Sequence, residues 1–401
     1  MFVKGASIVK ITRLIKVIAA DYLICSGLCL NVLLIGLYVY DVTLIHLVYE
    51  RAEKVLRSGL SRNPPINKQG QLKEQLANAI AGNFGEWRPL PHFEPVAAGQ
   101  VSVDDILSSS LSDAVANLHD GQLLVIGSGT YREPLVVTAN NVTIIGSGRV
   151  VFDGATAEGK AAIVTKGKQI TISNIECKNI AVDDLNGACI RSEGGSLTVD
   201  HVYFHDSEQG ILANNNQYLH ISNSRFEKLG KYGRAHGVYV GEGGELLVEN
   251  SLFLASVSEG HEIKSRASKT IIKNSVLASL DADDSRLIDV PNGGELLVVD
   301  SVLEKGPQSV NATAIGYGLE GIKYGLNSIT LKKNVIILER DGQNALLDKP
   351  AKEPISLRVV GNIIVSKDEV DVQGLNWPYL SRQEAKMEAY PKLPVLEDKQ
   401  P

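Results

Sequence analysis

One pattern recurs through most of this 401-residue chain and limits its possible folds more than any other feature. Apolar residues occupy positions −4 and −2, a turn residue occupies position 0, and an apolar residue follows at position +3. The pattern reads ITISNIEC around Asn174, LHISNSRF around Asn223 and LLVENSLF around Asn250. Nine copies, from Gly146 to Gly361, follow one another at intervals of 22 to 33 residues. A strand–helix–strand unit needs about 30 residues or more, so the spacing predicts one coil of a parallel β-solenoid per copy.

The alternating apolar residues predict strands that bury one face. A single coil cannot bury that face without a neighbour above and below it, so the coils must stack. Parallel strands lie about 4.8 Å apart, which brings equivalent residues of successive coils together. We expect the asparagines at position 0 to pair amide to amide in the turns and to be structural: Asn174, Asn223, Asn250 and Asn274.

The segment before the repeats reads LSDAVANLHDGQLLVIGSGTYREPLVVTANNVTIIGSG, which indicates a short amphipathic helix, a Gly turn, a strand and the first coils. With the repeats, it resembles the pectate-lyase-like family of right-handed parallel β-helices over about residues 104–370. The resemblance implies an all-β solenoid and a carbohydrate partner, usually acidic and polymeric, in a groove parallel to the helix axis. It does not select a reaction, because similar folds host lyases, hydrolases, epimerases, esterases and adhesins.

A membrane anchor is predicted before the solenoid. The stretch from Tyr22 to Tyr40 carries no charge and is long enough to span a bilayer. Because basic residues precede it, residues 1–21 are predicted to be cytoplasmic and residues 22–49 to form a single transmembrane anchor in the inner (cytoplasmic) membrane. The rest of the chain would face the periplasm or the exterior. A cleaved signal peptide is the alternative, but the apolar run is long and no small-x-small site follows it.

The remaining chain divides by its composition. Residues 50–100 predict a helical stalk and a Pro-rich linker, residues 101–370 the parallel β-helix, and residues 371–401 a C-terminal cap or tail. The formal net charge of −6 gives no positive field for nucleic acid, which excludes that class of partner. Four cysteines are too few for a disulfide framework, so we expect disulfides not to hold this fold together.

The second strand of each coil carries the candidate site. Its inward residues are expected to be Cys189, Ile211, Val238, Ile263, Ile288 and Ile315. The residues that follow would form an outward ladder: Ile190, Leu212, Tyr239, Lys264, Asp289 and Gly316. The residues that precede the inward ones would also face out: Gly210, Gly237, Glu262, Leu287 and Ala314. Arg266 would lie beside Gly241 and Pro291.

This register gathers charged and polar side chains from three consecutive coils. The candidate catalytic residues are Lys264, Arg266, Tyr239, His261 and His236, and the candidate substrate-binding residues are Glu262, Arg286, Asp289, Asn292 and Glu320. A uronate lyase must hold a carboxylate with a cation, remove the proton α to it and protonate the leaving oxygen. Arg266 suits bidentate carboxylate binding. Lys264 is a candidate base, and Tyr239 or His261 a candidate base or acid. Epimerisation at the same carbon needs the same groups.

Other interpretations of these residues stay open. Pairs such as Lys264 with Asp289 are typical of a solvated face with exposed ion pairs. Asp281, Asp283 and Asp284 resemble a calcium loop, although an acidic turn without metal is favoured, so calcium is the one cofactor considered and none is certain. In the tract NATAIGYGLEGIKYG, the side chains that would contact sugar are Tyr317, Glu320 and Tyr324, with a plain loop as the alternative.

Hydrolysis by paired carboxylates is disfavoured. Asp183 and Asp184 lie about three coils from His261, whereas the corresponding motifs of polygalacturonases are about one coil apart. The sequence therefore predicts an anchored protein that acts on an acidic exopolysaccharide as a lyase or epimerase. The alternatives are a non-catalytic scaffold that binds or exports polysaccharide, with synthesis or export machinery as further partners, and a structural surface protein.

Overall fold

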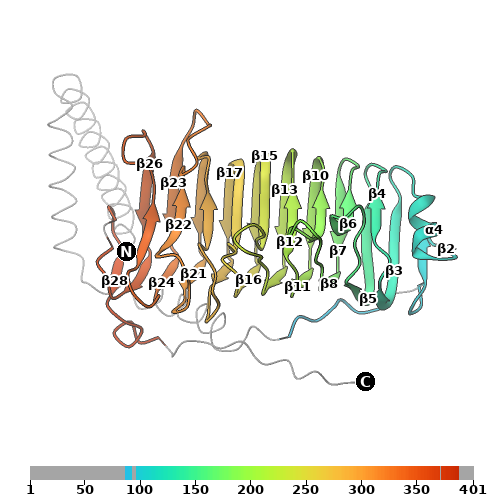
Figure 1. Ribbon diagram of the computed structural model, residues 1–401, viewed down its shortest axis with the longest axis horizontal. Helices are drawn as coiled ribbons and strands as arrows, with labels where there is room; N and C mark the ends of the chain where they lie inside the picture. Colours follow the sequence, from blue (N-terminus) through green and yellow to red (C-terminus); the bar gives the residue numbers. More distant parts are fainter. Residues whose placement is uncertain (1–85, 93–95, 371, 388–401) are drawn as a thin grey trace, which may run out of the picture. The chain divides into compact units, whose positions relative to one another are not determined.

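The computed structural model describes residues 86–92, 96–370 and 372–387 of the chain (Figure 1). The predicted cytoplasmic segment, transmembrane anchor and helical stalk lie outside the described residues, as does the end of the predicted tail, whereas residues 86–92 and 96–100 of the predicted linker are described and contain no helix or strand. Within the described ranges, no helix is long and apolar enough to cross a membrane.

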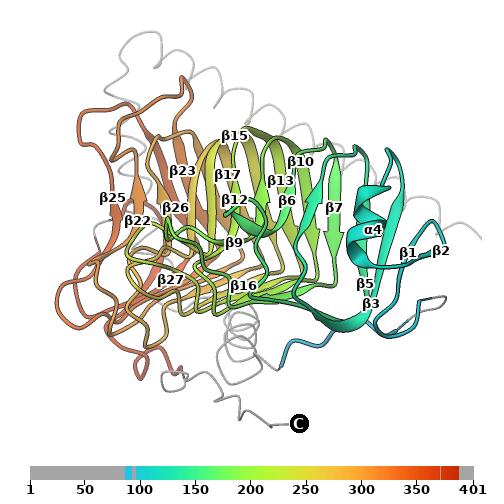
Figure 2. The same cartoon turned by 45° about the vertical axis from the view of Figure 1, so that its right-hand side comes forward.

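The described strands form one continuous sheet that is wound into stacked coils with three faces. Figure 1 shows the coils side by side, from β3 near one end to β26 near the other, and Figure 2 shows the faces from a second direction. The site face consists of β4 (Leu135–Val137), β6 (Ala161–Thr165), β9 (Ala188–Ser192), β12 (Gln209–Ala213), β19 (Ile288–Val290), β22 (Thr313–Tyr317), β25 (Ala345–Asp348) and the first halves of β15 (Val238–Glu249) and β17 (Ile263–Lys273).

The other two faces complete each coil. The second face holds the first halves of β3 (Leu123–Tyr131) and β5 (Thr143–Asp153), β7 (Ile170–Ser173), β10 (Gly195–Asp200), β13 (Asn216–Ser222), the second halves of β15 and β17, β20 (Glu295–Val299), β23 (Ser328–Lys332) and β26 (Ser356–Val360). The third face holds the second halves of β3 and β5, β8 (Glu176–Lys178), β11 (Tyr203–His205), β14 (Arg225–Glu227), β16 (Leu252–Leu254), β18 (Val276–Ala278), β21 (Val302–Lys305), β24 (Val335–Leu338), β27 (Ile363–Ser366) and β28 (Trp377–Tyr379). Pairing between these coils is parallel throughout, which confirms the predicted solenoid.

A short capping segment covers the first coil. Strands β1 (Val101–Val103) and β2 (Ile106–Ser108) form an antiparallel hairpin, and β1 also pairs antiparallel with β3. Helix α4 (Leu111–Ala116) follows and buries Leu111 and Ala114. Ser110 caps this helix, because its side chain accepts a hydrogen bond from the backbone N–H of Asp113 at 3.0 Å. The amphipathic helix and first strands predicted from the sequence are therefore present.

Position 0 of the repeat takes the left-handed backbone conformation, with φ between 45° and 71°, in these eight coils: Asn174, His201, Asn223, Asn250, Asn274, Asp300, Lys333 and Gly361. Asn, Asp and Gly tolerate this conformation best, which explains why they recur there. The predicted amide ladder at position 0 is wrong. Asn174 donates instead to the backbone carbonyls of Gly146 and Gly148, at 2.6 and 3.0 Å.

A polar ladder does exist, one residue later. The backbone N–H of Ser275 donates to Ser301 Oγ at 3.2 Å, and that of Ser301 donates to Asn334 Oδ1 at 3.0 Å. Asn334 and Asn362 continue the ladder, with 3.0 Å between Asn334 Nδ2 and Asn362 Oδ1. All four side chains are buried, so the ladder satisfies backbone donors that water does not reach.

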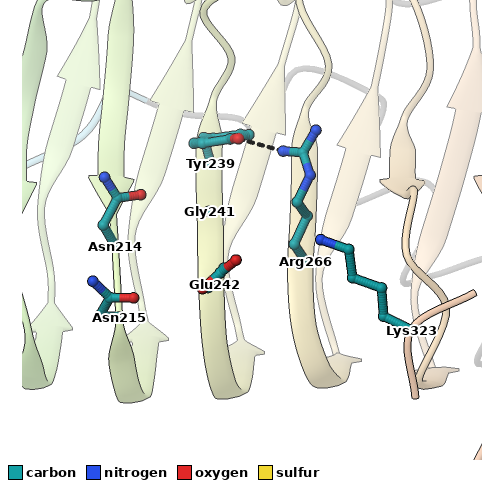
Figure 3. Close-up of a pocket in the computed structure, with 7 residues that line it drawn as sticks. All are labelled: Asn214, Asn215, Tyr239, Gly241, Glu242, Arg266 and Lys323. Carbon is teal, nitrogen blue, oxygen red and sulfur yellow. Dashed lines mark hydrogen bonds between the residues drawn. The ribbon is translucent and has the colours of Figure 1, made fainter. Parts of the chain in front are cut away.

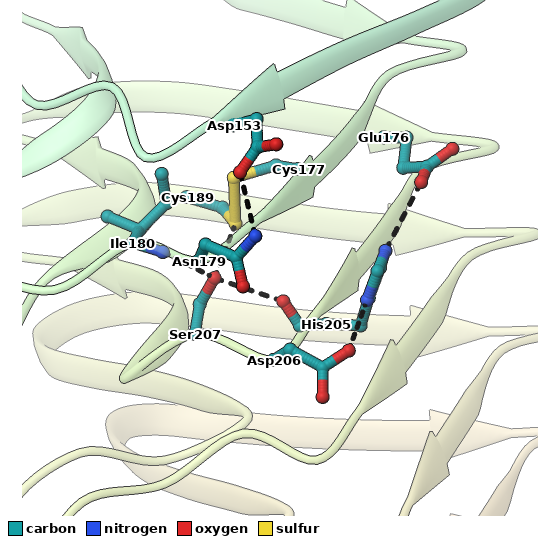
Figure 4. Close-up of a disulfide and its surroundings, with 9 residues drawn as sticks. All are labelled: Asp153, Glu176, Cys177, Asn179, Ile180, Cys189, His205, Asp206 and Ser207. Atoms are coloured by element: carbon teal, nitrogen blue, oxygen red, sulfur yellow. Dashed lines mark hydrogen bonds and ion pairs between the residues drawn. A yellow bond between two sulfur atoms is a disulfide. The ribbon is translucent and has the colours of Figure 1, made fainter. Parts of the chain in front are cut away.

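One disulfide, between Cys177 in β8 and Cys189 in β9, joins the third face to the site face within a coil (Figure 4). The expectation that disulfides do not hold the fold together therefore needs correction for this coil. The predicted register of β9 is also wrong, because Ile190, and not Cys189, lies level with Ile211. Cys189 and Ile190 are both fully buried, so apolar character alone did not distinguish them.

Candidate functional site

The site face brings most of the predicted site residues together. Leu212, Tyr239, Lys264 and Asp289 lie opposite one another in successive strands, which confirms that part of the predicted ladder. In β9, Arg191 takes the place predicted for Ile190. A second outward row begins one residue beyond the paired positions Ala213, Val240 and Ser265, and consists of Asn214, Gly241 and Arg266.

An open hollow of about 390 Å³ lies over this second row (Figure 3). Its lining residues are Asn214, Asn215, Tyr239, Gly241, Glu242, Arg266 and Lys323. Gly241 lies between Asn214 and Arg266 in this row, and a Cβ atom there would lie 2.1 Å from the end of the Asn214 side chain. Any larger residue at position 241 would therefore displace the Asn214 side chain.

Arg266 and Tyr239 form one wall of the hollow. Arg266 Nη1 donates a hydrogen bond to Tyr239 Oη, and the guanidinium carbon lies 5.2 Å from the centre of the Tyr239 ring. The Arg266 side chain is 17% exposed, so solvent or a ligand reaches it. This contact places a hydroxyl group next to the cation that suits a carboxylate.

Lys264 lies in the adjoining row and is bound by two carboxylates. Its Nζ is 3.3 Å from Asp289 Oδ2 and 3.2 Å from Glu320 Oε1. Glu320 also accepts a hydrogen bond from Arg266 Nη2 at 2.6 Å, so one carboxylate bridges both cations. Burial acts to raise the pKa of Glu320, but Arg266 and Lys264 outweigh it and lower that pKa.

Asp289 lies beneath this bridge and is 4% exposed. Besides Lys264, it faces Arg286 Nη1 at 3.6 Å and His261 Nε2 at 3.7 Å. Burial raises the pKa of Asp289, although Lys264 and Arg286 oppose that rise. The predicted Lys264–Asp289 pair is therefore present, but it is not the exposed surface pair of the alternative interpretation.

The two histidines form a ladder of their own, with ring centres 4.8 Å apart. His236 Nδ1 accepts from the backbone N–H of His261 at 3.2 Å, and His261 Nδ1 accepts from that of Arg286 at 3.0 Å. Burial, with the charges of Lys264 and Arg286, lowers the pKa of His261 to about 3. Burial also lowers the pKa of His236 well below its usual value. Both rings are thus neutral acceptors, an arrangement that favours a structural role over proton transfer.

Two predicted substrate-binding residues do not reach the surface. Glu262 is 1% exposed, and its Oε1 and Oε2 accept from the backbone N–H and the hydroxyl of Ser256 at 3.0 and 2.6 Å. Its predicted outward position is wrong, as are those of Leu287 and Ala314, which are both fully buried. Glu262 and Leu287 directly precede their strands and are covered in the turn, whereas Ala314 is buried within β22. Asn292 is 2% exposed and donates to the carbonyl of Gly321 at 3.2 Å.

Some of the predicted sugar-contacting residues of the 311–325 tract are also bonded within the protein. Tyr317 is fully buried and donates to the carbonyl of Gly294, and burial raises its pKa to about 12. Tyr324 donates to the carbonyl of Arg266, so it holds the tract against the site. Of the three residues, only Glu320 presents an exposed charge to the site.

The donor set of the acidic loop does not fit calcium. Asp284 is buried, where it accepts from Ser279 Oγ at 2.8 Å and lies 3.4 Å from Lys305 Nζ. Asp283 accepts from the backbone N–H of Ser258 at 2.8 Å. Among the described residues, no group of three or more His, Cys, Asp and Glu side chains converges to hold a metal ion.

Sequence reasoning missed Asn214, Asn215, Glu242 and Lys323 as members of the hollow. The first three lie just beyond the outward ladder, where the strands continue into the next turn. The run of asparagines at 214–216, next to the outward ladder, was the available signal. Lys323 comes from the 311–325 tract, where the repeat pattern does not predict the position of a side chain.

A family model described as a right handed beta helix region matches residues 127–277. The chain is a right-handed parallel β-helix. This confirms the handedness and fold implied by the resemblance to pectate-lyase-like proteins. No sequence among curated proteins matches the chain significantly.

Similar solved structures include an alginate lyase from Paenibacillus sp. str. FPU-7, with 15% identity, a TM-score of 0.48, and coverage of 68% of this chain and 93% of that one. They also include the pectate lyase Pel9A, with 16% identity, a TM-score of 0.39, and coverage of 73% and 85%. The pectin methylesterase PemA from Erwinia chrysanthemi has 13% identity, a TM-score of 0.36, and coverage of 76% and 100%. Likeness of this size describes the fold alone.

Proposed function

We propose that this right-handed β-helix binds an acidic polysaccharide along its site face and moves the proton α to a uronate carboxylate. The observation that carries the proposal is the contact between Arg266 and Tyr239 at the wall of an open hollow. A cation that binds carboxylate and a hydroxyl that exchanges a proton are the two groups that this chemistry needs side by side.

Arg266 is assigned to the substrate carboxylate. Its planar guanidinium suits two parallel hydrogen bonds to one carboxylate, and it lies at the surface of the hollow. Removal of the α proton places negative charge on that carboxylate, so the same guanidinium stabilises the charge that develops in the transition state.

Tyr239 is assigned to proton transfer. In elimination, the deprotonated Tyr239 oxygen would take the α proton as the carbon–hydrogen bond breaks, and the electron pair moves onto the carboxylate held by Arg266. The carbon–carbon double bond then forms as the bond to the leaving glycosidic oxygen breaks, and Tyr239 returns the proton to that oxygen. In epimerisation, the carbon would instead regain a proton from water on its opposite side, and Tyr239 would release its proton to solvent. Both reactions balance without an added cofactor.

Lys264 is assigned to charge stabilisation in place of the base role considered from the sequence. Its two carboxylate partners, at 3.2 and 3.3 Å, suit an ammonium ion better than a neutral amine. With Arg286 nearby, it extends the positive charge along the helix axis, in the direction that a polymer would follow.

A non-catalytic scaffold is the second candidate. It is favoured by the ion pairs themselves, because Lys264 and Arg266 are already bound to carboxylates of the chain. Such a protein would bind polysaccharide through the same face without changing it.

Prediction one tests the assignments. The full-length chain is incubated with pectate and with alginate, and ultraviolet absorbance of unsaturated ends and proton NMR of inverted residues are recorded. We expect Arg266→Ala and Tyr239→Phe each to lower turnover by about 100-fold or more, the scale of a lost transition-state donor. Lys269→Ala, on the second face, is the control. Full turnover by the Tyr239→Phe variant would remove Tyr239 from the chemistry.

A further inference from the structure

Glu320 occupies the place that a ligand carboxylate would need. Its Oε1 lies 3.2 Å from Lys264 Nζ, and its Oε2 lies 2.6 Å from Arg266 Nη2. The two cations are 14% and 17% exposed, so they accept one bridging carboxylate at the surface and not two. A second carboxylate at the same place would be repelled by the first.

The backbone that carries Glu320 is fixed. The N–H of Glu320 donates to the carbonyl of Pro291 at 2.9 Å, and the N–H of Lys323 donates to that of Asn292 at 2.9 Å. Asn292 also holds the carbonyl of Gly321 at 3.2 Å. The Glu320 side chain is 46% exposed, so it leaves the cations by rotating into solvent without movement of its backbone.

We propose that Lys264 and Arg266 form a subsite for a single uronate carboxylate, and that Glu320 is its built-in competitor. This inference rests on the proposed function. Glu320 is 46% exposed, so solvent screens its side of the two ion pairs, and a ligand carboxylate that makes the same contacts replaces it at small cost. A neutral sugar supplies no charge to replace it. The two cations therefore favour acidic over neutral residues, and Glu320 lowers the affinity for both.

The test compares Glu320→Gln with Glu245→Gln in the full-length chain. Glu245 lies on the second face, where its Oε2 is 3.1 Å from Lys269 Nζ, so its variant removes the same charge and frees a cation away from the site. Binding of galacturonate and mannuronate hexasaccharides, and of a neutral maltohexaose, is measured by calorimetry. We expect Glu320→Gln to bind at least one acidic hexasaccharide about 10-fold or more tighter than the wild type, or about 1.4 kcal/mol. Glu245→Gln should change that affinity by about threefold or less, as a screened surface charge does.

The outcomes separate the two levels of the account. If the wild type binds an acidic hexasaccharide and Glu320→Gln binds it equally or more weakly, the competitor role is wrong while the proposed function stands. If neither the wild type nor Glu320→Gln binds any acidic hexasaccharide, the competitor role and the proposed function are both wrong, because a subsite freed of its competitor must accept a carboxylate. Equal tightening by the two variants would show a general charge effect and would also overturn the competitor role.

Discussion

Whether a side chain of the site face is exposed or buried depends on its position within the strand or in the turn that precedes it. Tyr239, Lys264 and Arg266 face the surface, as the period of two predicts, because they lie within the regular part of β15 and β17. Glu262 directly precedes β17 and was predicted to face out by the same period. It is buried instead, because side chains alternate between inward and outward only within a regular strand.

Glu262 gives a prediction for the pH dependence of stability. Burial, with the nearby charge of Asp284, raises the pKa of Glu262 from 4.5 to about 8. The folded state therefore binds more protons than the unfolded state between those values, and this residue's contribution to stability is lost as the pH rises from about 5 to about 8. Burial also raises the pKa of Glu304 to about 7, which acts in the same direction.

Prediction two is that Glu262→Gln removes part of this loss. At pH 8, the variant should unfold with a free energy about 1–3 kcal/mol higher than that of the wild type. At pH 5, the two should agree within about 1 kcal/mol. Chemical denaturation at both pH values measures the difference, with Glu369→Gln at an exposed position as the control. A variant that is less stable than the wild type at pH 8 would show that Glu262 is stabilised as a carboxylate.

At the level of strands and turns, the repeat allowed each coil to be predicted, but not the row of hydrogen-bonded polar side chains in the turns. The apolar residues at −4 and −2 predict which strand residues are buried, and therefore where the strands lie. Which turn residue bonds to its neighbour depends on the backbone conformation, and position 0 takes a left-handed φ, with Asn174 and Asn223 bonded to partners other than asparagine. The buried ladder accordingly runs through serines and asparagines one residue later.

Prediction three concerns that ladder. Asn334→Ala should lower the free energy of unfolding by about 1–3 kcal/mol, because it leaves the buried backbone N–H of Ser301 without its acceptor. Asn223→Ala is the matched control, since Asn223 lies at position 0, where its side chain bonds to Asp200 at an exposed site. Equal losses in the two variants, measured by urea denaturation, would contradict the assignment of the ladder to position +1.

In the candidate site, too, residues in stacked strands could be predicted, and residues from irregular segments could not. The pairing of Tyr239 with Lys264 and Asp289 could be predicted, because it follows from stacking. The bridge from Glu320 could not, since it depends on where an irregular tract returns to the surface. Gly241, which also lines the hollow, gives no signal in an apolar pattern either.

At the scale of the whole molecule, the described residues account for the solenoid, and the predicted anchor lies outside them. We propose from the uncharged stretch at Tyr22–Tyr40 and its basic flank that the β-helix faces away from the cytoplasm. The Cys177–Cys189 disulfide is in keeping with an oxidising compartment.

Prediction four tests this topology. In intact spheroplasts, added protease should digest the β-helix, because it is expected to lie outside the cytoplasmic membrane. A cytoplasmic marker protein should survive in the same sample. Digestion of the β-helix only after the membrane is broken would reverse the proposed orientation.

If the site face removes the hydrogen α to a uronate carboxylate, that hydrogen exchanges with solvent deuterium, and the exchange can be followed by NMR. The full-length chain is incubated in D₂O with pectate, alginate and the exopolysaccharide of the host, and proton NMR follows the hydrogen α to each carboxylate. We predict that this signal decays with at least one polymer, and that the decay slows by about 100-fold or more in Arg266→Ala. An unchanged signal for every polymer, while one of them still co-sediments with the protein, would contradict the enzyme account and leave a binding scaffold.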